Sequence, residues 1–237
     1  NYINSKLKIF SLKKKKDFSL IKDKKFLNFY NKKKLGGKLK LITSKKYTII
    51  KNKIRNNYLK SEANFENMIF VYEISILFKI KKFFFIKYMN SFKGLEHRQE
   101  IFLKKKNVLF INDSKATSFE ATKLVLKSYK NILWIIGGIP KKNDRIKLNN
   151  IKKNISKCFI IGNHIVHFKK QLINKVKFSV SKTLDKAISD IFKEIKKMKG
   201  QSIVLFSPTG SSFDQYKNFV ERGNQFKKIV RLHANKF

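Results

Sequence analysis

Residues 107–117 read Asn-Val-Leu-Phe-Ile-Asn-Asp-Ser-Lys-Ala-Thr, and this stretch passes directly from an apolar run into polar side chains. Four consecutive apolar residues at 108–111 predict a strand that is buried on both faces, as strands of parallel sheets are. Asp113, Lys115 and Thr117 follow at once. Ligands of parallel α/β sheets bind beyond the carboxyl ends of the strands, so these side chains belong to a candidate binding edge.

The same alternation of short apolar runs and amphipathic stretches continues to the end of the chain. Further strands are predicted at 132–136, 158–161, 176–180 and 203–206, and helices at 116–130, 184–198, 213–219 and 224–233. Strands that alternate with helices in this way indicate βαβ units. We therefore predict an α/β fold for residues 93–237, with a Rossmann-like, mostly parallel sheet and flanking helices.

Residues 1–92 have a different pattern and form the first of two expected domains. Short strands are predicted at 39–42 and 47–50 around a Thr43-Ser44 turn, followed by a helix over 62–80 with one apolar stripe. The segment 91–94 is typical of a linker, because it ends in Lys93-Gly94.

The net charge of +41 is less informative than its size suggests, because only five of the 56 basic residues are arginine. Proteins that read nucleic acids rely on arginine for bidentate contacts to bases and phosphates. Lysine, asparagine, isoleucine and phenylalanine are all abundant, which is the pattern that AT-rich codons produce. A basic nucleic-acid-binding module stays an alternative, but no specific nucleic-acid partner is expected.

No segment of the sequence resembles a membrane span or a secretory signal. The most apolar stretch, 68–86, is interrupted by Glu73 and three lysines, whereas a spanning helix needs roughly 18 to 20 apolar residues. The single cysteine, Cys158, fits a reducing compartment. We expect a cytoplasmic protein without a membrane partner.

Three polar segments follow predicted strands and therefore meet at one edge of the sheet. They are the segment around Asp113, the Gly137-Gly138 pair with Lys141, and the Ser/Thr/Gly-rich segment 207–212. Each has an ordinary explanation, as a helix cap or a turn with solvated lysines. Together they favour a site for an anion at this edge.

Four ordered motifs resemble those of the Mur ligases. They are Gly-Leu-Glu-His-Arg-Gln-Glu at 94–100, Ile-Asn-Asp-Ser-Lys-Ala-Thr at 111–117, Gly137-Gly138 with Lys141, and Ser-Pro…Ser-Phe-Asp-Gln-Tyr-Lys-Asn-Phe…Arg-Gly within 207–223. Within the family the last motif is most similar to that of members that add D-glutamate. The resemblance also covers residues 1–92, more weakly, as the truncated C-terminal part of the family's central ATPase domain, before a glutamate-binding domain at 93–237.

The resemblance implies an ATP-dependent carboxylate–amine ligase of peptidoglycan precursor synthesis. The resemblance implies that ATP phosphorylates the carboxylate of UDP-N-acetylmuramoyl-L-alanine; the amine of D-glutamate then attacks the acyl phosphate, and phosphate leaves as the amide forms. ATP and Mg²⁺ are the implied cofactors, and a full-length member is expected to be a monomer. A related folylpolyglutamate-type ligase is a second alternative, but the Ser-Phe-Asp-Gln and Arg-Gly signature favours the D-glutamate ligases.

For the nucleotide and the metal, the resemblance assigns five residues. Lys6 matches a lysine that is carbamylated, and the carbamate oxygens would help to hold Mg²⁺, which prefers hard oxygen ligands. Asn64 and Asn67 match an Asn-x-x-Asn pair that contacts adenine. Arg98 matches a nucleotide-contacting arginine, and Asp113 the aspartate that accepts from the ribose hydroxyls.

For D-glutamate, the resemblance implies two separated carboxylate sites. Thr117 and Lys141 match residues near the α-carboxylate, whereas Ser212 and the backbone of Phe219 match those near the side-chain carboxylate. Two fixed carboxylates would orient the amine of only one enantiomer toward the acyl phosphate. Lys115 would add positive potential for the charge that develops in the tetrahedral intermediate, so it is assigned with Lys6 as catalytic.

The sequence also departs from the family pattern. Ser61 and Ala63 replace the glycine and histidine of Gly-x-His-Asn-x-x-Asn, Ser118 replaces an asparagine, and Thr209-Gly210 replaces an Ala-Cys pair. No Gly-x-x-x-x-Gly-Lys-Ser/Thr phosphate loop occurs. We expect the C-terminal portion of a longer ligase, inactive as given.

Overall fold

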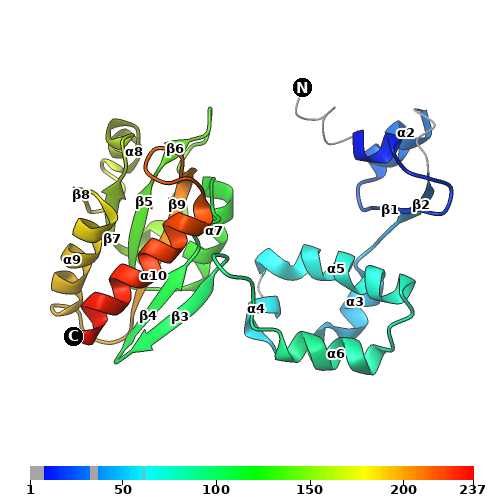
Figure 1. Ribbon diagram of the computed structural model, residues 1–237, viewed down its shortest axis with the longest axis horizontal. Coiled ribbons are helices and arrows are strands. Elements are labelled where there is room, and N and C mark those ends of the chain that lie inside the picture. Colours follow the sequence, from blue (N-terminus) through cyan, green and yellow to red (C-terminus); the bar gives the residue numbers. More distant parts are fainter. Residues whose placement is uncertain (1–7, 33–36, 61) are drawn as a thin grey trace. The chain divides into compact units, whose positions relative to one another are not determined.

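The computed structural model describes residues 8–32, 37–60 and 62–237. The chain divides into two compact units, Asn1–Lys93 and Gly94–Phe237 (Figure 1). The roles that the sequence suggests for them, ATP binding and glutamate binding, remain predictions.

The second unit is built on a seven-stranded sheet with the order β3-β4-β9-β5-β7-β8, and the short β6 pairs with β9 (Figure 1). The strands β4, β9, β5, β7 and β8 are parallel, whereas β3 and β6 are antiparallel to their neighbours. This confirms the predicted mostly parallel α/β sheet. The strands are β3 (Glu100–Lys105), β4 (Val108–Asn112), β5 (Ile132–Gly137), β6 (Ile139–Pro140), β7 (Ile155–Ile161), β8 (Phe178–Lys182) and β9 (Ser202–Ser211).

Helices cover both faces of this sheet, because the buried strands place alternate residues in two separate cores. Phe110, Leu133 and Val204 pack in one core with residues of α9 and α10, whereas Trp134 and Leu205 pack in the other with residues of α7 and α8. Alternation of side chains along each strand explains the division. The helical elements are α7 (Phe119–Ser128), η2 (Asn149–Asn154), α8 (Ile165–Leu172), α9 (Leu184–Ile195) and α10 (Phe219–Asn235).

The first unit is mainly helical and contains a parallel pair of strands, β1 with β2. Its core includes the buried side chains of Tyr47, Ile50, Met68, Ile69 and Phe85. In the described residues, no helix of either unit is long and apolar enough to cross a bilayer. The elements are β1 (Phe18–Ile21), α2 (Lys24–Lys32), β2 (Lys38–Leu41), α3 (Lys45–Ile50), η1 (Lys51–Lys53), α4 (Asn57–Lys60), α5 (Glu62–Leu77) and α6 (Lys82–Ser91).

Two sequence predictions about secondary structure were wrong. The segment 47–50 is not a strand but the end of α3, where Tyr47 and Ile50, three residues apart, are both buried. Helical spacing of the buried pair therefore overrode the strand preference of the intervening β-branched residues. Residues 213–218 are a loop, and α10 begins at Phe219, where the Asn218 side chain accepts from two backbone amides.

The strand β9 extends beyond the predicted 203–206, to Ser211, and includes most of the Ser/Thr/Gly-rich segment 207–212. Ile139 and Pro140 of β6 pair with Ser211 and Gly210, so the end of β9 has a partner strand. The edge strand β3 was not predicted, because its lysine-rich sequence lacks a continuous apolar run.

Candidate functional site at the carboxyl ends of β4, β9 and β5

The polar segments predicted from the sequence lie together where three adjacent parallel strands end. The amide of Asp113 donates to the carbonyl of Phe206, and the amide of Thr209 donates to that of Ala116, 3.1 Å away. Thr209 in turn pairs with Gly137. The ends of β4, β9 and β5 are thus joined by backbone hydrogen bonds, which fixes the side chains that follow them.

Asp113 is a buried carboxyl at the centre of this edge, and only 5% of the residue is exposed. Its Oδ2 accepts from the Ser207 hydroxyl at 2.7 Å, and its Oδ1 accepts from the Gln99 amide at 3.1 Å. Burial raises the pKa of Asp113 to about 7, although these two hydrogen bonds and the charge of Arg98 act in the opposite direction. Neither Asp113 nor Ser114 caps α7, whose cap position is Ser118.

Ser207, which donates to Asp113, also forms hydrogen bonds with residues of the core. Its hydroxyl lies 2.7 Å from that of Thr122, and its carbonyl accepts from the Trp134 ring nitrogen at 2.8 Å. Both serine and threonine are fully buried. The carboxyl is therefore held in one orientation by groups that water does not reach.

Lys115 and Phe219, which the sequence assigned to the reaction and to glutamate binding, lie against each other. The Lys115 ammonium is 3.8 Å from the centre of the Phe219 ring. The neighbouring Ser114 hydroxyl donates to the Phe219 carbonyl at 2.8 Å. The start of α10 is thereby fastened to the end of β4, with a cation above an aromatic face.

The other residues assigned to glutamate follow the same strand ends. Exposed Lys141 directly follows β6, whose Pro140 pairs with Gly210 of β9, so the chain leaves β6 on the side of Thr209. Ser212 follows β9 and is buried. Thr117 follows Ala116, whose carbonyl is bonded to the Thr209 amide.

Gly138 makes the close approach of these segments feasible. Its φ is +92°, and a Cβ there would clash with the Ser211 carbonyl and lie 3.0 Å from Arg222 Nη1. A glycine is required on both grounds. The Gly137-Gly138 pair of the sequence therefore serves backbone packing at this edge.

Arg222 was not assigned to the site, yet it links three segments of the edge. The guanidinium donates to the Ser114 carbonyl at 2.8 Å, to the Ser114 hydroxyl at 3.1 Å and to the Gly210 carbonyl at 3.1 Å. Burial lowers its pKa to about 10. The scarcity of arginine in this chain was the available signal, because a fixed fork of donors is what such a position needs.

His97 is a second residue of this edge to which the sequence assigned no role, although it lies inside the Gly-Leu-Glu-His-Arg-Gln-Glu motif at 94–100. The ring is buried, its backbone φ is +61°, and Asn112 Nδ2 lies 2.9 Å from its Nδ1. The amide is a donor, so Nδ1 accepts and the proton is on Nε2. Nε2 has no hydrogen-bond partner among the described residues. Burial, and then the charge of Lys227, lower the pKa of His97.

An ion-pair network supports this histidine. The His97 amide donates to Glu100 Oε2 at 3.0 Å, and Lys227 donates to Glu100 Oε1 at 3.0 Å. The His97 ring meets the Phe219 ring edge-on at 5.9 Å. Gly223 lies beneath the ring, where a Cβ would clash with Nδ1.

The residues assigned to adenine lie in the first unit, inside α5 rather than at a helix cap. The Asn67 side chain donates to Asn64 Oδ1 at 3.3 Å, and Asn64 donates to the Tyr58 carbonyl at 2.9 Å. Arg98 is exposed on the second unit. Lys6 lies outside the described residues, and the described part holds no cluster of three or more acidic, histidine or cysteine ligands.

The loop between β9 and α10 is held by hydrogen bonds to residues at the ends of β7 and β8. Asp214 Oδ2 accepts from the Asn163 amide at 3.1 Å, and the Gln215 side chain donates to the Lys182 carbonyl at 3.3 Å.

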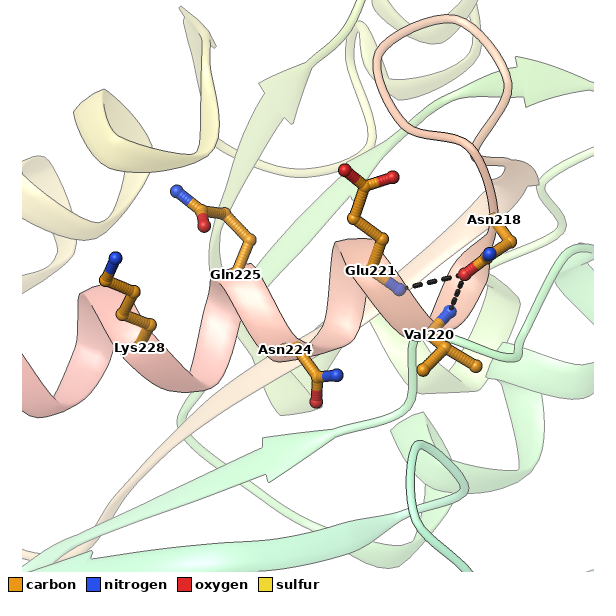
Figure 2. Close-up of a pocket in the computed structure, with 6 residues that line it drawn as sticks. All are labelled: Asn218, Val220, Glu221, Asn224, Gln225 and Lys228. Atoms are coloured by element: carbon orange, nitrogen blue, oxygen red, sulfur yellow. Dashed lines mark hydrogen bonds between the residues drawn. The ribbon is translucent and has the colours of Figure 1, made fainter.

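The outer side of α10 carries an open pocket of about 450 Å³. Figure 2 shows the pocket residues, with Asn218 capping the helix through Val220 and Glu221. The pocket is lined by Asn218, Val220, Glu221, Asn224, Gln225 and Lys228, none of which the sequence assigned.

Comparison with known proteins gives consistent relatives. Proteins named UDP-N-acetylmuramoylalanine--D-glutamate ligase match from Wolbachia sp. subsp. Brugia malayi, 36% identical over 217 residues, and from Nitrobacter hamburgensis, 38% identical over 144 residues. The first match covers 87% of this chain and 44% of the relative, and the second 60% and 31%. The chain thus spans less than half the length of these curated relatives.

Solved structures show the same fold. A MurF ligase from Thermotoga maritima in complex with ADP matches with a TM-score of 0.64 at 11% identity, covering 99% of this chain and 57% of that one. MurF from Acinetobacter baumannii matches with a TM-score of 0.54 at 13% identity, covering 72% and 38%. No family model matches the chain.

Proposed function

Since this chain belongs to the Mur ligase family, we propose that it carries the amino-acid-binding part of an ATP-dependent ligase that adds D-glutamate to UDP-N-acetylmuramoyl-L-alanine. The product would be a peptidoglycan precursor. The reaction consumes ATP and a nucleotide-linked substrate, so its expected compartment is the cytoplasm.

One observation carries this proposal: the four residues assigned to D-glutamate all follow the joined strand ends of the second unit. Lys141 follows β6 and Ser212 follows β9, and these two strands pair antiparallel, so the two side chains leave the pairing from its opposite ends. Phe219 is fastened to the end of β4 through Ser114. Thr117 is one residue from the backbone bond to Thr209. A dicarboxylate with two fixed ends is the ligand that such an arrangement suits.

Charge also favours an acidic substrate at this edge. Lys141 is exposed and Lys115 lies over the Phe219 ring. Arg222 is bonded to Ser114 and Gly210, so it adds a fixed positive charge beneath them. In the proposed reaction Lys141 and Thr117 hold the α-carboxylate, whereas Lys115 stabilises the negative charge of the tetrahedral intermediate.

The nucleotide assignment is supported at one residue of the second unit. Asp113 has a buried carboxyl held by Ser207 and Gln99 at the end of a parallel strand, where nucleotides bind in such sheets. Each carboxylate oxygen accepts one of these hydrogen bonds and keeps capacity for a ribose hydroxyl. Arg98 would meet a phosphate, and Asn64 with Asn67 the adenine edge. Mg²⁺, with the Lys6 carbamate as a ligand, remains part of the proposal without a described site.

A binding experiment tests the proposal directly. Ligand-observed NMR of the chain with D-glutamate and with L-glutamate should detect selective binding of the D-enantiomer. Lys141→Ala should abolish the signal. Lys193→Ala, which removes an exposed lysine from the far helix α9, has the same change in charge and should leave the signal intact.

Two outcomes contradict the proposal. Equal binding of both enantiomers would show that the edge attracts any dicarboxylate through charge alone. Loss of binding in both lysine variants would show that glutamate binding depends on the overall net charge of +41 and not on Lys141 itself. In either case the basic-module alternative gains, and binding of an oligonucleotide should then compete with glutamate.

A further inference from the structure

Exposed apolar side chains concentrate at one place in the first unit, the connection between α5 and α6. We define the α5–α6 tip as Phe78, Ile80, Phe83, Phe84 and Tyr88. Phe78 is 76% exposed and Phe83 is 70% exposed, values unusual for phenylalanine. Further exposed apolar residues, Val71, Ile74 and Ile76, lie just before the tip on α5.

The geometry of α6 forces these rings outward. Phe85 is buried in the core of the first unit, with its ring 4.9 Å from that of Tyr72. Consecutive helical residues point about 100° apart, so Phe83 and Phe84 cannot share the buried direction of Phe85. Phe84 instead stacks on Tyr88 at 6.5 Å, on the surface.

The turn at the tip is ordered by its own hydrogen bonds. The Ile80 amide donates to the Ser75 carbonyl at 2.9 Å, and the Lys79 amide donates to the Ile76 carbonyl at 3.0 Å. Lys79 has a φ of +55°. This is the Schellman pattern of helix ends, with Lys79 in the position that glycine usually takes. The exposed rings are therefore held apart from the core by a defined turn.

The charge around the tip has one sign. Lys79, Lys81, Lys82 and Lys87 alternate with the apolar residues, and no acidic residue occurs between Glu73 and Glu96. Glu73 itself is buried and is paired with Lys40 and Lys46, at 2.9 and 3.2 Å. The four lysines that alternate with the residues of the tip thus have no acidic neighbour in sequence to neutralise them.

We propose that the α5–α6 tip docks onto the surface of an anionic lipid bilayer. Phe78, Ile80 and Phe83 enter the boundary between headgroups and acyl chains, while the lysines contact lipid phosphates. Apolar and aromatic side chains that alternate with lysines suit this interface, because each group finds its preferred surroundings within a few ångströms. Surface docking requires no spanning helix, and the proposal departs from the expectation of a protein without a membrane partner.

A lipid surface fits the tip better than a nucleic acid does. Single-stranded nucleic acids bind in grooves that follow the phosphate backbone and stack bases on aromatic rings. The tip is a turn between two helices, and the aliphatic Ile80 lies between its phenylalanines. Ile80 has no stacking role, whereas it contributes to insertion into lipid.

The test places a fluorescent side chain in the tip. Trp134 is the only tryptophan and is fully buried, so it gives a constant background. In Phe83→Trp, vesicles of phosphatidylcholine with anionic phosphatidylglycerol should shift the emission to the blue, and brominated lipids should quench it. Phe213→Trp is the matched control, since Phe213 is also 70% exposed but lies in the other unit.

The net charge makes general adhesion to anionic vesicles the main competing explanation. The double variant Phe78→Ser with Phe83→Ser should bind vesicles at least about tenfold more weakly, because it lacks the two rings that would be buried in the lipid. Lys79, Lys81 and Lys82→Gln should weaken it more than the same changes at the exposed Lys196, Lys197 and Lys199.

Several results would overturn the proposal. Equal quenching of Phe83→Trp and Phe213→Trp would mean adhesion without insertion. A blue-shifted Phe83→Trp without vesicles would mean that protein covers the tip. If sedimentation shows association that the two serine changes abolish, a second copy is the occupant, and if an oligonucleotide alone quenches the tip tryptophan, the ligand is a nucleic acid.

Discussion

The buried carboxyl of Asp113 makes the stability of the second unit depend on pH in an unusual direction. Its pKa is 3.8 in an ordinary setting and about 7 in the folded protein, mainly because of burial. Between these values the folded state keeps a proton that the unfolded state has released. The free energy of unfolding should therefore fall as the pH rises from about 4 to about 7, and then level off.

The size of the effect follows from the two pKa values. A tenfold difference in proton affinity is worth about 1.4 kcal/mol, so the rise from 3.8 to about 7 costs on the order of 4 kcal/mol of stability above pH 7. Asp113→Asn has nearly the same shape, and its side-chain oxygen can still accept a hydrogen bond, but it never ionises. We expect the free energy of unfolding of Asp113→Asn, relative to that of the parent protein, to rise by about 4 kcal/mol from pH 4 to pH 8.

Trp134 gives the measurement a probe inside the same unit. Its ring nitrogen bonds to the Ser207 carbonyl, directly behind Asp113. Urea unfolding followed by tryptophan fluorescence at pH 4.5, 6 and 8 yields the stability of parent and variant, and other acidic groups cancel in the difference. Asp185→Asn is the control, because that side chain is 73% exposed. A difference between parent and Asp113→Asn that stays constant with pH would refute the reasoning.

Three further substitutions test the packing of the edge by urea unfolding. Arg222→Met should cost about 3 kcal/mol, because two buried carbonyl oxygens lose their donors; a loss under 1 kcal/mol would mean that water replaces the guanidinium. Gly223→Ala should cost about 1 to 2 kcal/mol, because the clash with His97 exceeds the gain in helix propensity, and His97→Ala should remove most of that cost. Thr209→Ala should instead stabilise the protein by about 1 kcal/mol, because Thr209 has a φ of +62° and a buried hydroxyl without a described partner; destabilisation would indicate that the hydroxyl holds a bound water.

The fold of the second unit could be read from the sequence because its inner strands are continuous apolar runs. Residues 132–136 and 203–206 have no other plausible place than a sheet covered on both faces. The edge strand β3 gives no such signal. It pairs with β4 on one side, and its side chains are only partly buried, so its sequence needs no continuous apolar run. The loop 213–218 looks helical in sequence, yet Asp214 accepts a hydrogen bond from the amide of Asn163, far away in the chain.

The candidate site was predictable where the chain order itself carries the information. Asp113 and Lys115 directly follow a buried strand, so their position at the edge follows from the strand prediction. His97 and Arg222 were missed because their roles depend on partners that no local pattern reveals. His97 contacts Asn112 and Gly223, and Arg222 contacts Gly210 from the opposite end of the loop.

The place of β9 in the sheet also determines when the second unit can be completed during synthesis. β9 lies between β4 and β5, but it is the last strand to be made. Before residue 202 emerges, β3–β4 and β5–β7–β8 are two separate half-sheets whose inner edges are open to other chains. Insertion of β9 joins the halves, and α10 then covers one face. A ribosome that stalls after β8 would thus release a chain with two unpaired parallel edges, which chaperones would have to shield.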